Sequence, residues 1–172
     1  MKIYLKMIPR ISERIVRKLS GDGDIEVADD KLEEAAMDAS SVFRSYVEEE
    51  KKINDTVKDQ MEKRGLSQKD FMRVKEAVAK DRNFKLGDEG IDFVINQIIE
   101  LFMMTENVDE VYSEDHVIRK KIFDILKRFL DVDEELDKQA RERMKNLEEG
   151  TLDWDIAYEK NISQIRQNRG LV

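Results

Sequence analysis

The sequence predicts an all-α protein of elongated shape, built from two pseudo-repeated three-helix units with long central helices. The 172 residues include only 7 Gly and 1 Pro, well below the roughly 12% of an average protein, which argues against a β-sandwich or barrel. Charged residues make up 41% and apolar residues 40%, enough apolar surface to argue against disorder. Apolar residues recur with the 3.6-residue period of a helix along most of the chain.

Three helices are predicted in the first half. The first begins near residue 8 and ends at Gly21, and its apolar stripe consists of Ile8, Ile11, Ile15 and Leu19. In the acidic connector that follows, Ile25 and Val27 alternate with charged residues, as in a short extended segment. Asp30 and Glu33 resemble a capping box that opens a long helix ending at Gly65. The apolar face of this helix consists of Leu32, Ala35, Ala39, Val42, Phe43, Tyr46, Val47, Ile53, Val57 and Met61.

A shorter third helix is expected to begin at Ser67 and Asp70 and to bear Phe71, Val74 and Val78. The stretch from residue 82 to 87 then links the two halves of the chain.

The second half repeats this order. Asp88 is expected to cap a helix with the apolar residues Ile91, Val94, Ile95, Ile98, Ile99 and Phe102. An acidic connector over 105–113 follows, and Ser113 is expected to cap a second long helix that breaks at Gly150. The last helix carries a stripe of Trp154, Ala157, Tyr158, Ile162 and Ile165.

The matching order predicts an internal duplication. A shift of 83 residues places Asp70-Phe71 on Asp153-Trp154 and aligns most of the two halves without a gap. We therefore predict an N-terminal helical unit over residues 1–84 and a C-terminal helical unit over 85–172. The two aligned aromatic residues are expected to face the core of their units.

The length of the central helices leaves two possibilities for the shape of the molecule. A continuous helix over residues 30–62 would be roughly 50 Å long, whereas a compact globule of this size is about 40 Å across. Either the long helices break, near Glu48–Glu50 and Asp131, or the molecule is elongated.

Several features bear on location and chemistry. Cysteine is absent, which excludes disulfides, thiolate nucleophiles and Cys-ligated metals. No run of 18 apolar residues exists, and charges interrupt the first ten residues, so neither a membrane span nor a signal peptide is predicted. The expected location is cytoplasmic.

An acidic connector is the strongest candidate for a metal site. Its five carboxylates take positions 1, 3, 5, 9 and 12 of a calcium-binding EF-hand loop: Asp22, Asp24, Glu26, Asp30 and Glu33. Position 6 is Val27, where the sharp turn of the loop requires Gly. The five residues are therefore weak metal candidates, and the favoured interpretation is a solvated connector joined to a helix cap.

Other catalytic and nucleic-acid signals are missing. The single histidine, His116, lies beside Glu114 and Asp115 and is expected at the surface. No Gly-x-Ser-x-Gly, Walker or Gly-x-Gly-x-x-Gly motif is present. Residues 1–20 carry net charge +5, but residues 22–34 carry −6, and a chain of net charge −8 is a poor nucleic-acid binder.

Three groups of residues resemble a known family. They are Met1-Lys2-Ile3 with Ile8-Pro9-Arg10-Ile11, Asp70-Phe71 through Lys75 to Ala79-Lys80-Asp81-Arg82-Asn83-Phe84, and Trp154-Asp155-Ile156-Ala157-Tyr158 with Arg169-Gly170. In this order and spacing they are similar to the bacterial family catalogued as domain of unknown function 507. The resemblance implies a helical bacterial protein with no assigned activity, cofactor or catalytic residues.

These observations favour a non-enzymatic protein-interaction or adaptor protein of the bacterial cytoplasm. Long amphipathic helices are suitable docking surfaces, and the chain shows no nucleophile–base pair or phosphate-binding loop. We expect no cofactor, a protein partner, and neither nucleic-acid nor membrane binding. The alternative is a metal-dependent enzyme that uses the carboxylates of the acidic connectors.

Overall fold

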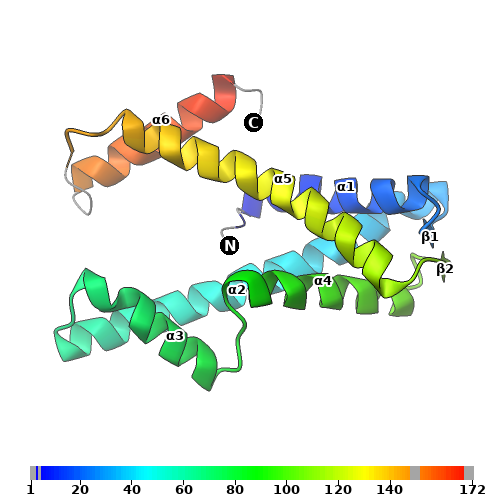
Figure 1. The fold of residues 1–172 in the computed structure, drawn as a ribbon, viewed down its shortest axis with the longest axis horizontal. Helices are drawn as coiled ribbons and strands as arrows, with labels where there is room; N and C mark the ends of the chain where they lie inside the picture. The colour runs from blue at the N-terminus through cyan, green and yellow to red at the C-terminus, as the bar shows by residue number, and fades with distance from the viewer. Residues whose placement is uncertain (1–2, 4, 148–151, 169–172) are drawn as a thin grey trace. The chain divides into compact units, whose positions relative to one another are not determined.

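The computed structural model describes residue 3, residues 5–147 and residues 152–168 (Figure 1). These form six α-helices and one two-stranded sheet, so the all-α fold class with long central helices is confirmed. The helices are α1 (Ile8–Gly21), α2 (Leu32–Arg64), α3 (Phe71–Asp81), α4 (Gly87–Met104), α5 (Asp115–Glu142) and α6 (Leu152–Asn168). The antiparallel strands β1 (Ile25–Glu26) and β2 (Glu110–Val111) join the two connectors.

The element order repeats as predicted. α1, β1, α2 and α3 are followed by α4, β2, α5 and α6. The shift of 83 residues carries the last residue of α1 onto the last residue of α4, and the first residue of α2 onto the first of α5. The compact units, however, are residues 1–126 and 127–172, because α4 packs against α2 and joins residues on both sides of position 84. The duplicated units 1–84 and 85–172 stay a prediction.

Both long helices are continuous. α2 is helical through Glu48–Glu50 and α5 through Asp131, so of the two alternatives the breaks near these residues are not found. The 33 residues of α2 correspond to a length of about 50 Å. Elongation of the whole molecule stays a prediction. No described helix is both long and apolar enough to cross a membrane.

α1 packs against the first part of α2, and α3 packs against the second part. The predicted stripe of α1 is buried as a whole. The contact between α2 and α3 is an apolar cluster of Ile53, Val57, Met61, Val74, Val78 and Ala79. Phe71 is half-buried and packs against this cluster, as its stripe predicts.

The turn between α2 and α3 follows the sequence signals. Gly65 adopts a left-handed conformation with φ of 61°, which a residue with a side chain adopts at a cost. The N–H groups of Gly65 and Leu66 donate to the last carbonyls of α2. The predicted start at Ser67 and Asp70 is confirmed, and the two residues form a capping box in which the Asp70 carboxylate accepts the backbone N–H of Ser67 at 3.2 Å.

Three other predicted caps are wrong. A 3₁₀ turn over Asp29–Lys31 precedes α2, so Asp30 does not occupy the cap position. α4 begins at Gly87 after Leu86, which places Asp88 within its first turn. α5 begins at Asp115, and the Ser113 hydroxyl donates to the Asp24 carboxylate instead of capping the helix. In the first turn, the charge of Asp88 is still favourable because it lies near the positive end of the helix dipole.

α4 is fixed to α2 at both ends. At its start, the Tyr46 hydroxyl donates to the Lys85 carbonyl oxygen at 2.8 Å, and the Tyr46 ring stacks on Phe84 with centroids 4.7 Å apart. Burial raises the pKa of Tyr46 to about 12. At its end, the Asp38 carboxylate accepts hydrogen bonds from Thr105 and Asn107. The two helices therefore run antiparallel.

The unit of residues 127–172 has its own small core. The later part of α5 contributes Leu136 and Ala140, and α6 contributes Ile162 and Ile165. Trp154 is half-buried rather than enclosed in this core. Its indole stacks on Tyr158 at 4.9 Å, and the Arg141 guanidinium lies 5.4 Å from its ring centroid. The predicted break at Gly150 lies outside the described residues.

The position of Tyr46 leaves no space for a side chain at Gly90. A Cβ atom at Gly90 would lie 2.2 Å from the Tyr46 hydroxyl oxygen and 2.7 Å from the Lys85 carbonyl oxygen. Gly90→Ala should therefore lower the free energy of unfolding by about 1–3 kcal/mol, through overpacking. Urea unfolding followed by circular dichroism at 222 nm measures it. Gly21→Ala is the control, because nothing lies within 4 Å of its Cβ position, and an equal loss in both variants would contradict the expectation.

Candidate functional site

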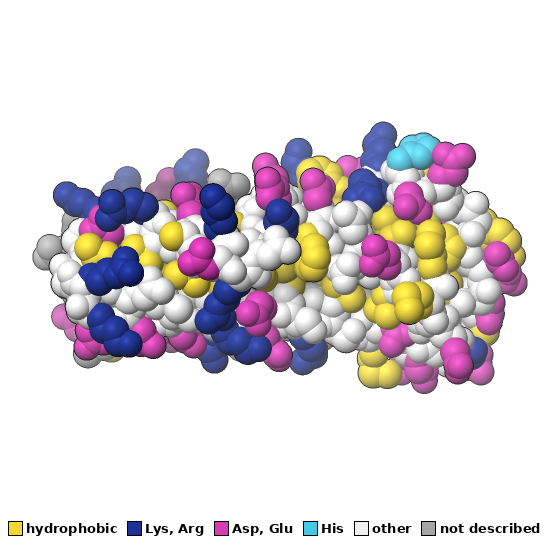
Figure 2. All heavy atoms as spheres, turned by 90° about the horizontal axis from the view of Figure 1, so that it is seen from below, with side chains coloured by type: hydrophobic (Ala, Val, Ile, Leu, Met, Phe, Trp, Pro, Cys, Tyr) yellow, Lys and Arg dark blue, Asp and Glu magenta, His cyan; other side chains and the backbone are white. Residues whose placement is uncertain are grey.

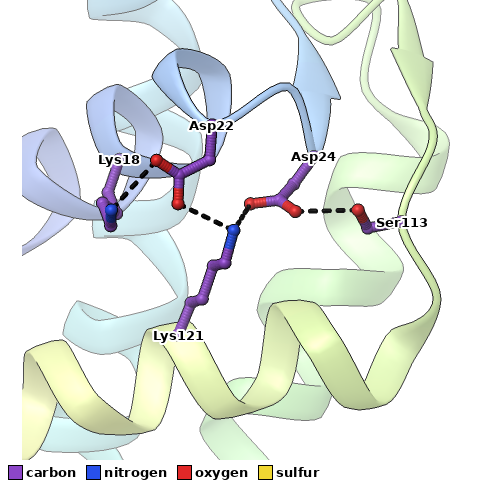
Figure 3. A network of polar contacts seen from close by, with 5 residues as sticks. All are labelled: Lys18, Asp22, Asp24, Ser113 and Lys121. Atoms are coloured by element: carbon purple, nitrogen blue, oxygen red, sulfur yellow. Dashed lines mark hydrogen bonds and ion pairs between the residues drawn. The ribbon is translucent and has the colours of Figure 1, made fainter.

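The acidic connector forms a network of ion pairs with α1 and α5 (Figure 3). Lys121 of α5 donates to Asp22 at 2.7 Å and to Asp24 at 2.6 Å. Lys18 of α1 donates to the other oxygen of Asp22 at 2.9 Å. The hydroxyl of Ser113 donates to Asp24 at 2.7 Å. The network therefore joins residues nearly 100 positions apart in the chain.

Asp24 is the centre of this network. It is only 3% exposed, so its interpretation as part of a solvated connector is wrong. A buried carboxylate needs compensation, and here Lys121 supplies the opposite charge and Ser113 a hydrogen bond. Its backbone carbonyl also accepts the N–H groups of Tyr112 and Ser113, next to the β1–β2 pair.

The other metal candidates lie apart from this centre. The Glu26 carboxylate accepts a hydrogen bond from the Tyr112 hydroxyl. Asp30 and Glu33 are exposed in the turn before α2 and in its first turn. In the described ranges, no three His, Asp or Glu side chains are grouped to hold a metal ion. Of the five candidates, the structure thus brings Asp22 and Asp24 together, because both pair with Lys121.

The charges in the network stabilise one another. Hydrogen bonds from Lys121 and Lys18 lower the pKa of Asp22 below its ordinary value. The same carboxylates raise the pKa of Lys121. The hydrogen bond to Glu26 raises the pKa of Tyr112. These shifts favour the charged forms of Asp22 and Lys121, as expected of a structural ion pair.

His116 is at the surface, as predicted. Its side chain is 76% exposed and its Nδ1 lies 3.2 Å from a carboxylate oxygen of Glu114. No other ion pair of His116 is found among the described residues.

A second candidate is an apolar groove between α2 and α4, which we call the α2–α4 groove. Its volume is about 460 Å³. α2 contributes Ser41, Val42, Ser45, Tyr46 and Glu49 to its lining; α4 contributes Phe93, Gln97, Glu100, Leu101 and Met104; Phe84 lies at one end. Val42 was expected on the buried face of α2 but, like Leu32 and Val47 of that face, it is only half-buried, and it lines the groove.

The wall formed by α4 is unusually apolar for a surface. Ten of the 18 residues of α4 are apolar, more than its buried stripe requires. In this wall, Phe93 is 45% exposed and Met104 82%; Met103, which is 58% exposed, lies outside the lining. Figure 2 shows hydrophobic side chains gathered over α4, with Asp and Glu side chains among them.

The groove was not predicted from the sequence, although α4 carries a signal for it. Phe93, Leu101, Met103 and Met104 lie off the stripe that faces the core, so α4 is apolar on more than one face. A helix of that kind requires cover on its second face.

The family comparison agrees with the resemblance noted from the sequence. The family model described as "Protein of unknown function (DUF507)" matches residues 1–171. The chain belongs to this family. The DUF507 description assigns neither an activity nor a ligand, and no curated protein matches the chain.

Asp24 should contribute to stability more than the exposed carboxylates. Asp24→Ala leaves Lys121 and Ser113 without their shared acceptor, and we expect a loss of about 2 kcal/mol in the free energy of unfolding. Asp30→Ala, at an exposed position, should change it by less than about 0.5 kcal/mol. Urea unfolding of both variants decides, and similar losses would contradict the buried role of Asp24.

The network also predicts a pH dependence. Folding lowers the pKa of Asp22. The contribution of Asp22 to the free energy of unfolding is therefore complete above its ordinary pKa of 3.8 and is lost as the pH falls through the lowered pKa. Folding raises the pKa of Lys121. The contribution of Lys121 to the free energy of unfolding is therefore complete below its ordinary pKa of 10.5 and is lost as the pH rises through the raised pKa.

The difference in urea midpoint between wild type and Lys121→Met should therefore be largest near neutral pH and shrink toward both extremes. Lys120→Met, the exposed neighbour on α5, is the control and should show little difference at any pH. A Lys121→Met difference that is unchanged at strongly acidic pH would contradict the ion pair with Asp22.

Proposed function

We propose that this DUF507 protein is a non-enzymatic protein-interaction or adaptor protein that binds a partner protein through the α2–α4 groove. The observation that supports the proposal is the apolar lining of the groove beside the exposed Phe93 and Met104. We propose the bacterial cytoplasm as its location, in line with the expectation from the sequence.

The exposed side chains provide a driving force for binding. Burial of a large apolar side chain contributes about 1.5–3 kcal/mol relative to full exposure. Phe93 and Met104 are only partly covered, so each retains a share of this free energy for a partner. Methionine side chains are flexible and polarisable, and they adapt to the surface that covers them.

A metal-dependent enzyme that uses the connector carboxylates has less support. Asp22 and Asp24 are occupied by Lys121, and a metal ion would have to displace that lysine. Asp30 and Glu33 are exposed but do not join them in a cluster among the described residues. The groove, by contrast, is open to a ligand without any rearrangement of side-chain pairs.

The test is affinity capture from the bacterium that produces the protein. Tagged wild-type protein should capture a partner protein. The double variant Phe93→Ser and Met104→Ser should capture at least tenfold less of that partner, because the apolar side chains of the groove wall are removed. Quantitative mass spectrometry measures the retained proteins, and circular dichroism checks that the variant is folded.

Met72→Ser is the matched control, because Met72 is 58% exposed on α3 and does not line the groove. It should retain the same partner as the wild type. Identical sets of retained proteins for wild type, groove variant and control would rule out the proposed function.

A further inference from the structure

We propose that the α2–α4 groove receives an amphipathic helix from another protein, with basic residues on both sides of its apolar stripe. This inference rests on the proposed function and specifies the chemistry of the partner. Its basis is the combination of groove shape, apolar lining and the sign of the surrounding charge.

The shape of the groove suits a helix. Its α4 wall extends from Phe93 to Met104, which corresponds to about 17 Å or three helical turns. Its α2 wall extends from Ser41 to Glu49 in the opposite direction. Two antiparallel helices leave a groove between their side-chain ridges, and a third helix can pack there with an i, i+3, i+4, i+7 stripe.

The charge along α4 itself has one sign, although Lys85, just before the helix, pairs with Glu89 at 3.7 Å and Arg44 is exposed on α2. Residues 86–116 contain nine Asp or Glu and no Lys or Arg. Glu100 lines the groove itself, and Asp92 is an exposed neighbour of Phe93. Among the ion pairs of the described residues, none involves Asp92 or Glu100; the Glu100 carboxylate accepts only the Gln97 side chain, at 3.0 Å. A basic partner would compensate both carboxylates.

The α2 wall differs, because its one carboxylate is already compensated. Glu49 pairs with Lys52 at 3.1 Å and with Arg82 at 3.4 Å. The pairing with these bases lowers the pKa of Glu49. The unpaired negative charge is thus on the α4 side, where Met104 and Phe93 are exposed.

In a second copy of the chain, neither α1 nor α3 offers such a helix. The outer face of α1 is basic, with Arg10, Arg14 and Arg17, but its apolar stripe is fully used in the core. The outer face of α3 presents one large apolar side chain, Met72. Among their described residues, α5 and α6 also present one large exposed apolar side chain each, Phe123 and Ile156. Exposed Lys120 and Lys127 lie near Phe123 on α5, but a single apolar side chain is not a stripe. We therefore assign the groove to a different protein.

The test uses four fluorescein-labelled 18-residue peptides and fluorescence anisotropy at low and high salt. The first has Leu at i, i+3, i+4 and i+7 positions and Lys elsewhere. The second and third replace every Lys with Gln or with Glu. The fourth has the composition of the first but a scrambled order without an apolar stripe.

We expect the basic amphipathic peptide to bind at least tenfold more tightly than the Gln, Glu and scrambled peptides, and to weaken with salt because the attraction is electrostatic. Glu100→Lys should weaken its binding at least fivefold at low salt. Glu76→Lys, the same charge change at an exposed position of α3 outside the groove, should leave it within twofold.

Equal binding of the Lys and Gln peptides would overturn the inference, as would equal binding of the Lys and scrambled peptides.

Other outcomes separate this inference from the proposed function. Suppose that the Gln peptide binds, that the Phe93→Ser and Met104→Ser double variant weakens its binding, and that Glu100→Lys does not. The proposed function then stands, and only the basic character of the partner is wrong. If the double variant weakens no peptide, the helix-binding inference is overturned, and affinity capture alone decides the proposed function. Self-association of the protein through the groove in sedimentation would also overturn it.

Discussion

The fold of residues 1–126 depends on α2 remaining helical for 33 residues without interruption. Neither Gly nor Pro occurs in α2, and the first residue that favours its termination is Gly65. This one helix packs against α1, α4 and α3. Its first part buries small and aromatic side chains, whereas its second part buries the aliphatic residues that meet α3. Because α1 and α4 cover separate parts of its surface, the strip that contains Val42 is left half-buried and becomes one wall of the groove.

The two connectors illustrate why acidic composition alone is a weak guide to metal binding. Asp24 and Asp30 belong to the same short stretch, yet one is buried on a lysine and the other faces solvent. A buried carboxylate that has an opposite charge and a hydroxyl donor is electrostatically satisfied, and removing its partners is costly. The network therefore fixes α5 and β2 against the end of α1. In this arrangement its carboxylates stabilise the fold.

At the surface, α1 and α4 differ, although each is the first helix in its half of the element order. α1 has one buried apolar stripe, and charged residues occupy most of its exposed face. α4 has a buried stripe as well, but its outer face carries Phe93 and Met104 beside Asp92 and Glu100, which have no ion pair within the described part of the chain. Apolar and acidic groups together attract a ligand that is both apolar and basic. The DUF507 description gives no activity, so the functional proposal rests on this difference between α1 and α4.

The sequence by itself determined the helices, their order and several of their ends, because periodicity, the left-handed Gly65 and the Ser67–Asp70 capping box act within a few residues. It misplaced the starts of α2 and α4, where a 3₁₀ turn and Gly87 took the positions assigned to Asp30 and Asp88. Only the tertiary structure decided the role of Asp24, since its lysine lies 97 residues away along the chain. It also decided that Phe93 and Val42 line a groove, because the exposure of an apolar side chain depends on which distant helix covers it.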